Sequence, residues 1–176
     1  MLVTLIAHTN DPEKTIAAAA KLCYSDAHIE TLLDGLTPEK TAAFLQKLND
    51  FGHASPIEHA SFTFGIEGVS RTFLAQVTRH RIASFSVQSQ RYVRLEDFRY
   101  VIPPEIEADP AAKAAFIDAM NADAKHYLEL VKALEEKHTH TLMEQGMPEK
   151  TARAKASKMA NEDARFVLPN ACETKM

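Results

Sequence analysis

The chain lacks the long apolar runs that mark membrane helices: no stretch of about 18 or more apolar residues occurs among its 176 residues. The N-terminal segment MLVTLIAHTN has neither the basic flank nor the cleavage site of a signal peptide. Only two cysteines are present, Cys23 and Cys172, too few for a disulfide framework and without metal-ligand spacing. We therefore expect a soluble, cytoplasmic protein with reduced thiols and no membrane partner.

Repeats and low-complexity segments are also absent, and the composition is 45% hydrophobic and 25% charged. Such values are typical of globular proteins, and this length suits one domain with its own core. The net charge of -4 disfavours nucleic acid as a partner, because attraction to a phosphate backbone needs a broadly basic face. We expect a single domain over residues 1–176.

Arginine nevertheless gathers in one segment. Six of the eight arginines lie in a window without lysine, namely Arg71, Arg79, Arg81, Arg91, Arg94 and Arg99. Guanidinium groups grip phosphate or carboxylate with paired donors, whereas lysine is a mobile point charge. Within an acidic chain this segment predicts a site for a small anionic ligand. The alternative is a solvated loop with surface salt bridges.

Hydrophobic periodicity and cap residues predict an α+β fold with a mixed sheet and long helices. Strands are expected over 2–8 and 60–67, with short extended pieces at 92–93 and 100–102. Helices are expected over about 11–23, 37–51, 70–80 and 109–143, and from Pro148 to before Pro169. The helix over 109–143 carries an apolar stripe that predicts packing and, in part, a subunit contact: Ile117, Met120, Ala124, Tyr127, Val131 and Leu134.

The arginine segment divides by geometry. On a helix over 70–80, Gln76, Arg79 and His80 share one face, whereas Arg81 points elsewhere and suits a second anion. In an extended segment Ser89 and Arg91 lie on one side, a pair that suits a phosphate monoester.

Other polar residues are more ambiguous. His53 and His59 are too far apart in sequence, and lack a third strong ligand, for a zinc site, so no metal is expected. A neutral imidazole against a planar ligand is one interpretation, and a structural histidine is the other. His138 and His140 are expected to be solvated, and Glu162 with Arg165 predicts either a site or an exposed ion pair. Neither cysteine has the surroundings of a nucleophile.

These residues resemble the flavin-dependent thymidylate synthases. The family signature is Arg-His-Arg, seven residues and then Ser, which matches Arg79-His80-Arg81 followed by Ser89. The upstream block GHASPIEHASFTF, Gln76, the trailing Gln90-Arg91-Tyr92 and the segment from Glu162 to Pro169 agree as well. Four blocks in the right order cover about residues 20–170.

The resemblance implies an enzyme that makes dTMP from dUMP. Methylenetetrahydrofolate would donate the carbon, and NADPH would supply reducing equivalents through bound FAD. It also implies a homotetramer whose active sites combine residues of several subunits, and no protein nucleophile.

The resemblance also assigns residues to ligands. Its dUMP contacts are Gln76, Arg79, Ser89, Gln90, Arg91 and Arg165. Its FAD or folate contacts are His53, Ser55, Arg79, His80, Arg81 and Glu162. Arg79 would touch both ligands, and Arg79 with Ser89 would be catalytic.

Two departures from the family pattern matter. Cys23 stands where the family more often has a small hydroxyl residue near the flavin. The sequence ends at Met176, before a segment in which the family carries further flavin and dUMP contacts, so we expect the family's C-terminal segment to be lacking. One alternative is therefore a non-catalytic nucleotide-binding module that keeps only the dUMP site. Another is an RNA-binding protein that uses the arginine segment with Tyr92, Phe98 and Tyr100 as stacking platforms, which the acidic remainder of the chain disfavours.

Overall fold

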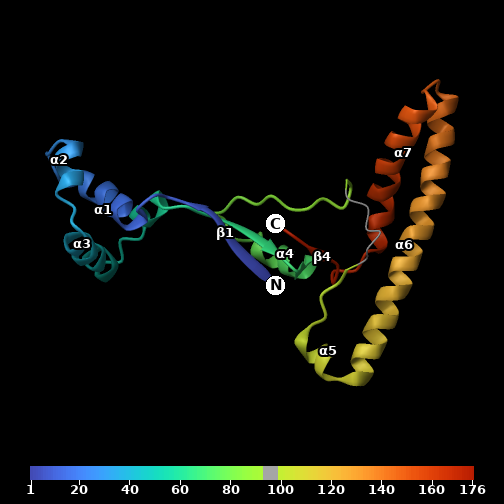
Figure 1. Ribbon diagram of the computed structural model, residues 1–176, viewed down its shortest axis with the longest axis horizontal. Helices are drawn as coiled ribbons and strands as arrows, with labels where there is room; N and C mark the ends of the chain where they lie inside the picture. The colour runs from blue at the N-terminus through green and yellow to red at the C-terminus, as the bar shows by residue number, and fades with distance from the viewer. Residues whose placement is uncertain (93–98) are drawn as a thin grey trace. The chain divides into compact units, whose positions relative to one another are not determined.

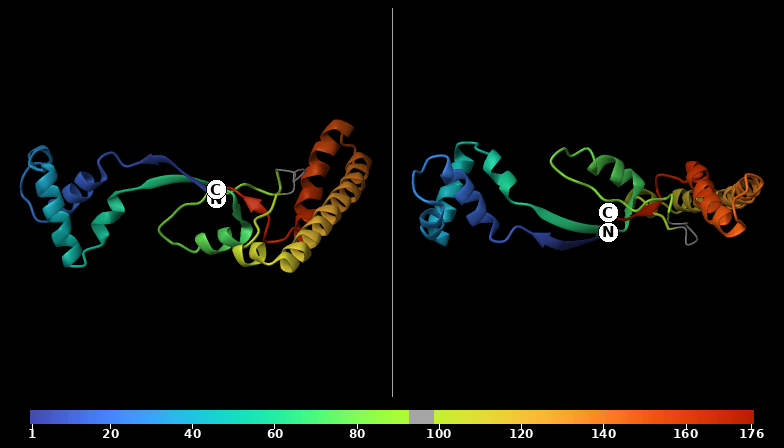
Figure 2. Two further views of the ribbon diagram at one scale, coloured as in Figure 1. Left: turned by 60° about the horizontal axis from the view of Figure 1, so that its bottom comes forward. Right: turned by 90° about the horizontal axis from the view of Figure 1, so that it is seen from above.

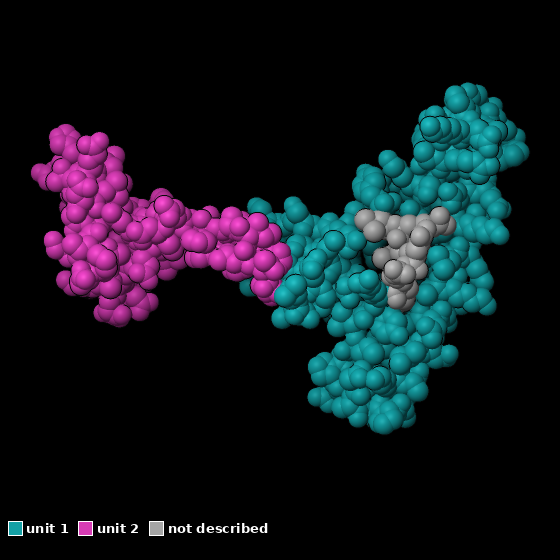
Figure 3. Space-filling model, viewed as in Figure 1, with its two compact units in different colours: residues 1–2, 66–176 teal, residues 3–65 magenta. Residues whose placement is uncertain are grey.

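The computed structural model describes residues 1–92 and 99–176. Val93, Arg94 and Phe98, which figured in the sequence predictions, lie outside the described residues. The chain divides into two compact units, one of residues 3–65 and one of residues 1–2 with 66–176 (Figure 3). Each unit is described by itself, and the single-domain expectation stays a prediction.

The unit of residues 3–65 is a group of short helices joined to a two-stranded sheet (Figure 1). Its elements are β1 (Leu2–His8), α1 (Pro12–Leu22), α2 (Ile29–Asp34), α3 (Pro38–Asp50), the 3-10 helix η1 (Ser55–His59) and β2 (Phe62–Glu67). Asp11 and Thr37 cap α1 and α3, each with its side chain accepting from a backbone N–H three residues on. Both helices and both strands were predicted. The helix α2 and the turn η1 were not.

The core of this unit is small. Ala17, Leu32 and Leu36 are buried, and Phe44 and Leu45 pack against them. The sheet is β1 paired with β2, and its apolar side chains stay open to solvent in the isolated chain: Leu2, Val3, Leu5, Ile6, Phe62 and Phe64. A two-stranded sheet is marginally stable alone, so we expect another protein surface to pack against these side chains.

The second unit contains β3 (Val69–Ser70), α4 (Arg71–Val77), α5 (Pro104–Ala108), α6 (Pro110–Glu144), α7 (Glu149–Ala164), the 3-10 helix η2 (Arg165–Val167) and β4 (Glu173–Thr174). The strands β3 and β4 pair antiparallel, with Val69 opposite Thr174. The prediction of a mixed α/β class with long helices is confirmed. Across the described residues, two separate two-stranded sheets replace the single mixed sheet that was expected.

The helices α6 and α7 form an antiparallel pair, side by side in both views of Figure 2. The buried residues of α7 include an alanine at every fourth position: Ala152, Ala156, Ala160 and Ala164. Such small side chains let the two helix backbones approach closely. Tyr127 and Val131, both in the predicted stripe of α6, are fully buried beside Ala164.

The predicted helix over 70–80 ends three residues early, at Val77. Thr78 caps it, and the Thr78 hydroxyl donates to Leu74 O at 2.9 Å. In the described parts of the chain, no helix has the length and hydropathy needed to cross a membrane.

Candidate functional site

The end of α4 presents four of the predicted site residues. The helix ends at Val77, so Arg79 and His80 lie in the turn that follows it. The expectation that they share a helix face with Gln76 is therefore wrong. The backbone N–H groups of Arg79 and His80 donate to Gln76 O and Val77 O, both at 3.2 Å. Gln76, Arg79, His80 and Arg81 are all exposed, so their polar groups are accessible to a ligand.

The loop after this turn is tied to the rest of the unit near its end. Arg71 Nη1 donates to Gln88 O at 3.4 Å, and Gln88 N donates to Lys175 O at 3.0 Å. Half-buried side chains follow from Val87 to Gln90. The loop therefore reaches Ser89 with its backbone held from two sides.

Ser89 leads into a turn that runs through Tyr92. The Ser89 hydroxyl oxygen accepts from the Arg91 N–H at 3.2 Å, the usual way in which serine stabilises a turn. The extended segment predicted for these residues is therefore wrong, although the two remain neighbours. The Arg91 guanidinium leaves the turn toward α7.

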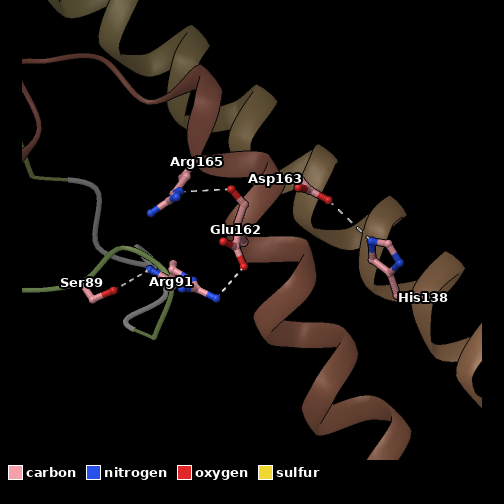
Figure 4. A network of polar contacts seen from close by, with 6 residues as sticks. All are labelled: Ser89, Arg91, His138, Glu162, Asp163 and Arg165. Carbon is pink, nitrogen blue, oxygen red and sulfur yellow. Dashed lines mark hydrogen bonds and ion pairs between the residues drawn. The ribbon is translucent and has the colours of Figure 1, made fainter.

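Arg91 and Arg165 meet at Glu162, near the end of α7 (Figure 4). Arg91 Nη2 lies 2.8 Å from Glu162 Oε2, and their side chains are 46% and 39% exposed. Arg165 Nε donates to the backbone oxygen of Glu162 at 3.1 Å, so the predicted Glu162–Arg165 ion pair is replaced by a side-chain to backbone bond. Two guanidinium groups thus meet at Glu162, and the Ser89 hydroxyl bonds to the backbone of one of these arginines, Arg91.

The neighbouring carboxylate is directed elsewhere. Asp163 Oδ2 lies 3.7 Å from His138 Nε2 on α6, and the His138 side chain is 20% exposed. The expectation of a solvated His138 is therefore wrong, because α7 covers it. His140 is exposed as expected and lies 3.4 Å from Glu144.

His53 and Ser55 belong to the other unit. There Gly52 follows the C-terminal cap of α3 with φ 68°. The N–H groups of Gly52 and His53 donate to Asn49 O and Leu48 O, both at 2.9 Å. This pattern is a Schellman motif, which satisfies the last carbonyls of the helix. It fixes the position of His53 directly after the helix, and Ser55 begins η1.

A hollow of about 300 Å³ opens beside His53. The other lining residues are mostly apolar: Ile16, Leu45, Leu48, Asn49, Gly52, Ala54 and Ile57. Its size lies at the lower end of small-molecule sites. An apolar hollow with one imidazole on its wall suits part of a planar ring, in line with the functional interpretation of His53.

The two cysteines differ in surroundings. Cys23 is exposed, Cys172 is buried, and both are free. The pKa of Cys172 is raised to about 11, chiefly by burial; the charge of Arg71 lowers the pKa and the charge of Asp123 raises it. A thiol with this pKa is protonated at neutral pH and is a poor nucleophile. Among the described residues, no group of three or more His, Cys, Asp or Glu side chains could hold a metal ion.

The structure gathers only part of the predicted set. Ser89, Gln90, Arg91, Glu162 and Arg165 lie at the turn and the end of α7, and Arg79, His80 and Arg81 follow α4 in the same unit. Sequence reasoning missed Lys158, whose ammonium lies over the Tyr92 ring. The sequence feature that could have identified Lys158 is its spacing of four residues from Glu162, which places both side chains on one helix face.

Comparison with known proteins identifies the family. The model of the family described as "Thymidylate synthase complementing protein" matches residues 4–176. The flavin-dependent thymidylate synthase of Clostridium tetani is 50% identical over 174 residues, which cover 99% of this chain and 67% of that protein. The enzyme of the same name from Geobacter sulfurreducens is 44% identical over 178 residues, covering 100% and 66%.

Solved structures show the same fold. The flavin-dependent thymidylate synthase of Helicobacter pylori, complexed with FAD and dUMP, has a TM-score of 0.55 at 24% identity, covering 99% of this chain and 76% of that one. The UMP/dUMP methylase PolB of Streptomyces cacaoi, bound with 5-Br dUMP, has a TM-score of 0.67 at 18% identity, covering 99% and 69%.

The chain spans about two thirds of the length of the curated relatives it matches. The family model matches residues 4–176, nearly the whole chain. The chain therefore belongs to the flavin-dependent thymidylate synthase family.

Proposed function

We propose that the protein methylates dUMP to dTMP, with FAD as its cofactor and methylenetetrahydrofolate and NADPH as co-substrates. The observation that carries the proposal is the meeting of Arg91 and Arg165 at Glu162, with the Ser89 hydroxyl bonded to the Arg91 backbone N–H. Two forked cations and a small hydroxyl are the groups that a nucleotide phosphate needs. Membership of the family supplies the reaction to which such a site belongs.

The dUMP side of the proposed site is the turn after the loop. Ser89 and Arg91 would bind the phosphate, Arg165 would add a second guanidinium, and Gln76 and Gln90 would donate to uracil or ribose. Arg79, exposed after α4, would place its fixed positive charge near the uracil oxygens. Such a preorganised charge stabilises the electron-rich ring as its C5 atom attacks the carbon donor.

The FAD and folate side would use His53, Ser55, Arg79, His80, Arg81 and Glu162. The residues present suit this role, because Arg81 offers an exposed guanidinium for a pyrophosphate and the hollow beside His53 accepts part of a planar ring. When bound, FAD supplies the one-carbon transfer and redox chemistry. The protein's share is to hold uracil, flavin and folate close together. The protonated thiol of Cys172 is consistent with a reaction that needs no cysteine nucleophile.

We propose further that the protein is a homotetramer with shared active sites. Support comes from the sheet of β1 and β2, where Ile6 is 65% and Phe62 is 52% exposed in the isolated chain. Apolar side chains in such a patch are typical of a subunit interface. The cytoplasmic location stays a prediction from the sequence.

The test is the colour and activity of the purified protein with its complete chain. The proposal predicts a yellow protein that oxidises NADPH only when dUMP is present and that forms dTMP when methylenetetrahydrofolate is added. A colourless protein that binds dUMP without NADPH oxidation would support the nucleotide-binding module. Salt-sensitive binding to single-stranded RNA, without dUMP binding, would contradict both.

A further inference from the structure

We propose that Lys158 is a further phosphate-binding residue of the nucleotide site, an inference that rests on the proposed function. The Lys158 ammonium lies over the Tyr92 ring, 5.5 Å from its centroid. The Arg91 guanidinium carbon lies 5.8 Å from the same centroid. Two cations from separate segments, the turn and α7, thus approach one aromatic ring.

The helix α7 brings Lys158 to the turn together with two residues already placed in the site. Lys158 and Glu162 are four residues apart and share one face of α7, and Arg165 follows directly after the helix, as the first residue of η2. Lys158 contacts Tyr92, and Glu162 pairs with Arg91. This face of α7 therefore lies against the turn from Ser89 to Tyr92. Lys158 contacts the last residue of that turn, Tyr92.

Charge complementarity identifies the ligand group. Among the described residues of this cluster, Arg91, Lys158 and Arg165 are cations and Glu162 is the only carboxylate. The nearby Asp163 is directed toward His138 on α6. The cluster therefore carries two positive charges in excess, and a phosphate monoester carries roughly -1.5 to -2 at pH 7. A neutral nucleoside would leave both charges uncompensated.

The three cations have different tasks. The arginines offer rigid forks that fix the phosphate in one orientation, whereas Lys158 offers a point charge on a flexible stem that can reach an outer oxygen. The Tyr92 ring keeps the ammonium near the turn by a cation–π contact. Lys158 is therefore in reach of a phosphate bound by Ser89 and Arg91.

The test is calorimetric titration of the protein, carrying its complete chain, with dUMP and with deoxyuridine. Lys158→Gln should weaken dUMP binding roughly tenfold, as expected for one lost charge-assisted contact, and leave deoxyuridine binding unchanged. Lys158→Arg keeps the charge and should stay within about twofold of the wild type. Lys150→Gln, an exposed lysine at the start of the same helix, is the matched control and should have no effect.

Three outcomes overturn the inference. Unchanged dUMP affinity in Lys158→Gln would show that the ammonium does not reach the phosphate, while the proposed function would stand. An equal loss for dUMP and deoxyuridine would show a structural effect and not phosphate recognition. A wild-type protein that does not bind dUMP would overturn the proposed function and this inference with it.

Discussion

Arg91 Nη2 lies 2.8 Å from Glu162 Oε2, so an arginine proposed to bind the dUMP phosphate already holds a carboxylate. Both side chains are partly exposed, and ion pairs of this kind contribute about 0.2–1 kcal/mol. The carboxylate therefore competes weakly with an incoming phosphate.

Glu162→Gln should thus raise the affinity for dUMP, by about two- to fivefold, because it removes both the competing carboxylate and its repulsion of the phosphate. Turnover should fall, since Glu162 is a proposed flavin-side residue. Calorimetric titration gives the affinity, and NADPH oxidation gives the turnover. A weaker affinity would show that Glu162 orients Arg91 for the nucleotide.

Replacing either of the two central arginines should weaken dUMP binding without unfolding the protein. Arg79 and Arg91 are exposed, so Arg79→Ala or Arg91→Ala removes charge without opening the core. Each variant should weaken dUMP binding by about tenfold or more, with unchanged far-UV circular dichroism. Unchanged dUMP affinity in either variant would count against its assignment.

Gly52→Ala should weaken FAD binding and lower the free energy of unfolding by about 1 kcal/mol. Gly52 has φ 68°, and an added Cβ would meet no atom within 4 Å, so the cost is backbone strain at the residue that positions His53. Gly146→Ala is the matched control, because Gly146 has φ 85°, equally open surroundings and a place after α6. Flavin fluorescence and urea unfolding measure the two effects. Equal loss of FAD in both variants would contradict a specific role of the α3 end.

Ile6→Asp should disrupt the proposed tetramer. Ile6 is 65% exposed on β1, and a charge in a buried apolar interface is strongly unfavourable. Light scattering after gel filtration should give a smaller mass for Ile6→Asp than for Thr63→Asp, a change of an exposed polar residue on β2. A monomeric wild-type protein would rule out the tetramer.

Alkaline pH should destabilise the protein through Cys172. Burial raises its pKa from 9.0 to about 11, so the folded state favours the neutral thiol. That contribution is complete below pH 9.0 and is lost as pH rises toward about 11, at most about 2 kcal/mol. Urea unfolding at pH 8 and pH 10.5 should show a larger drop for the wild type than for Cys172→Ser. Equal drops would assign the loss to other groups.

Local signals predicted much of the secondary structure. Asp11-Pro12, Thr37-Pro38 and Asp109-Pro110 each combine a cap with a proline at the first helical position, and each begins a helix in the structure. The 35-residue helix α6 was predicted because its apolar stripe is long. Short elements such as α2 and α5, with 6 and 5 residues, carry too few periodic positions to be recognised.

The site was predicted less completely, for a physical reason. Sequence spacing predicts which residues lie close together on a helix, so Glu162 and Arg165 could be expected as neighbours, although Arg165 Nε bonds to the Glu162 backbone and not to its carboxylate. It does not predict where a helix stops, and the end of α4 at Val77 moved Arg79 and His80 into a turn. Contacts between distant segments, such as Arg91 with Glu162 and His138 with Asp163, depend on tertiary packing that no local pattern encodes.

The pairing of β3 with β4 also bears on folding kinetics. The start of α4 is held by the far end of the sequence: Arg71 N donates to Cys172 O at 3.0 Å and Thr72 N to Asn170 O at 3.1 Å, and Thr72 and Asn170 are 98 positions apart. Contacts of such separation close late, because a large loop must lose its entropy first. During synthesis the arginine segment thus leaves the ribosome long before its anchoring strand exists. We expect this segment to stay unordered in the nascent chain until residues 170–176 have emerged.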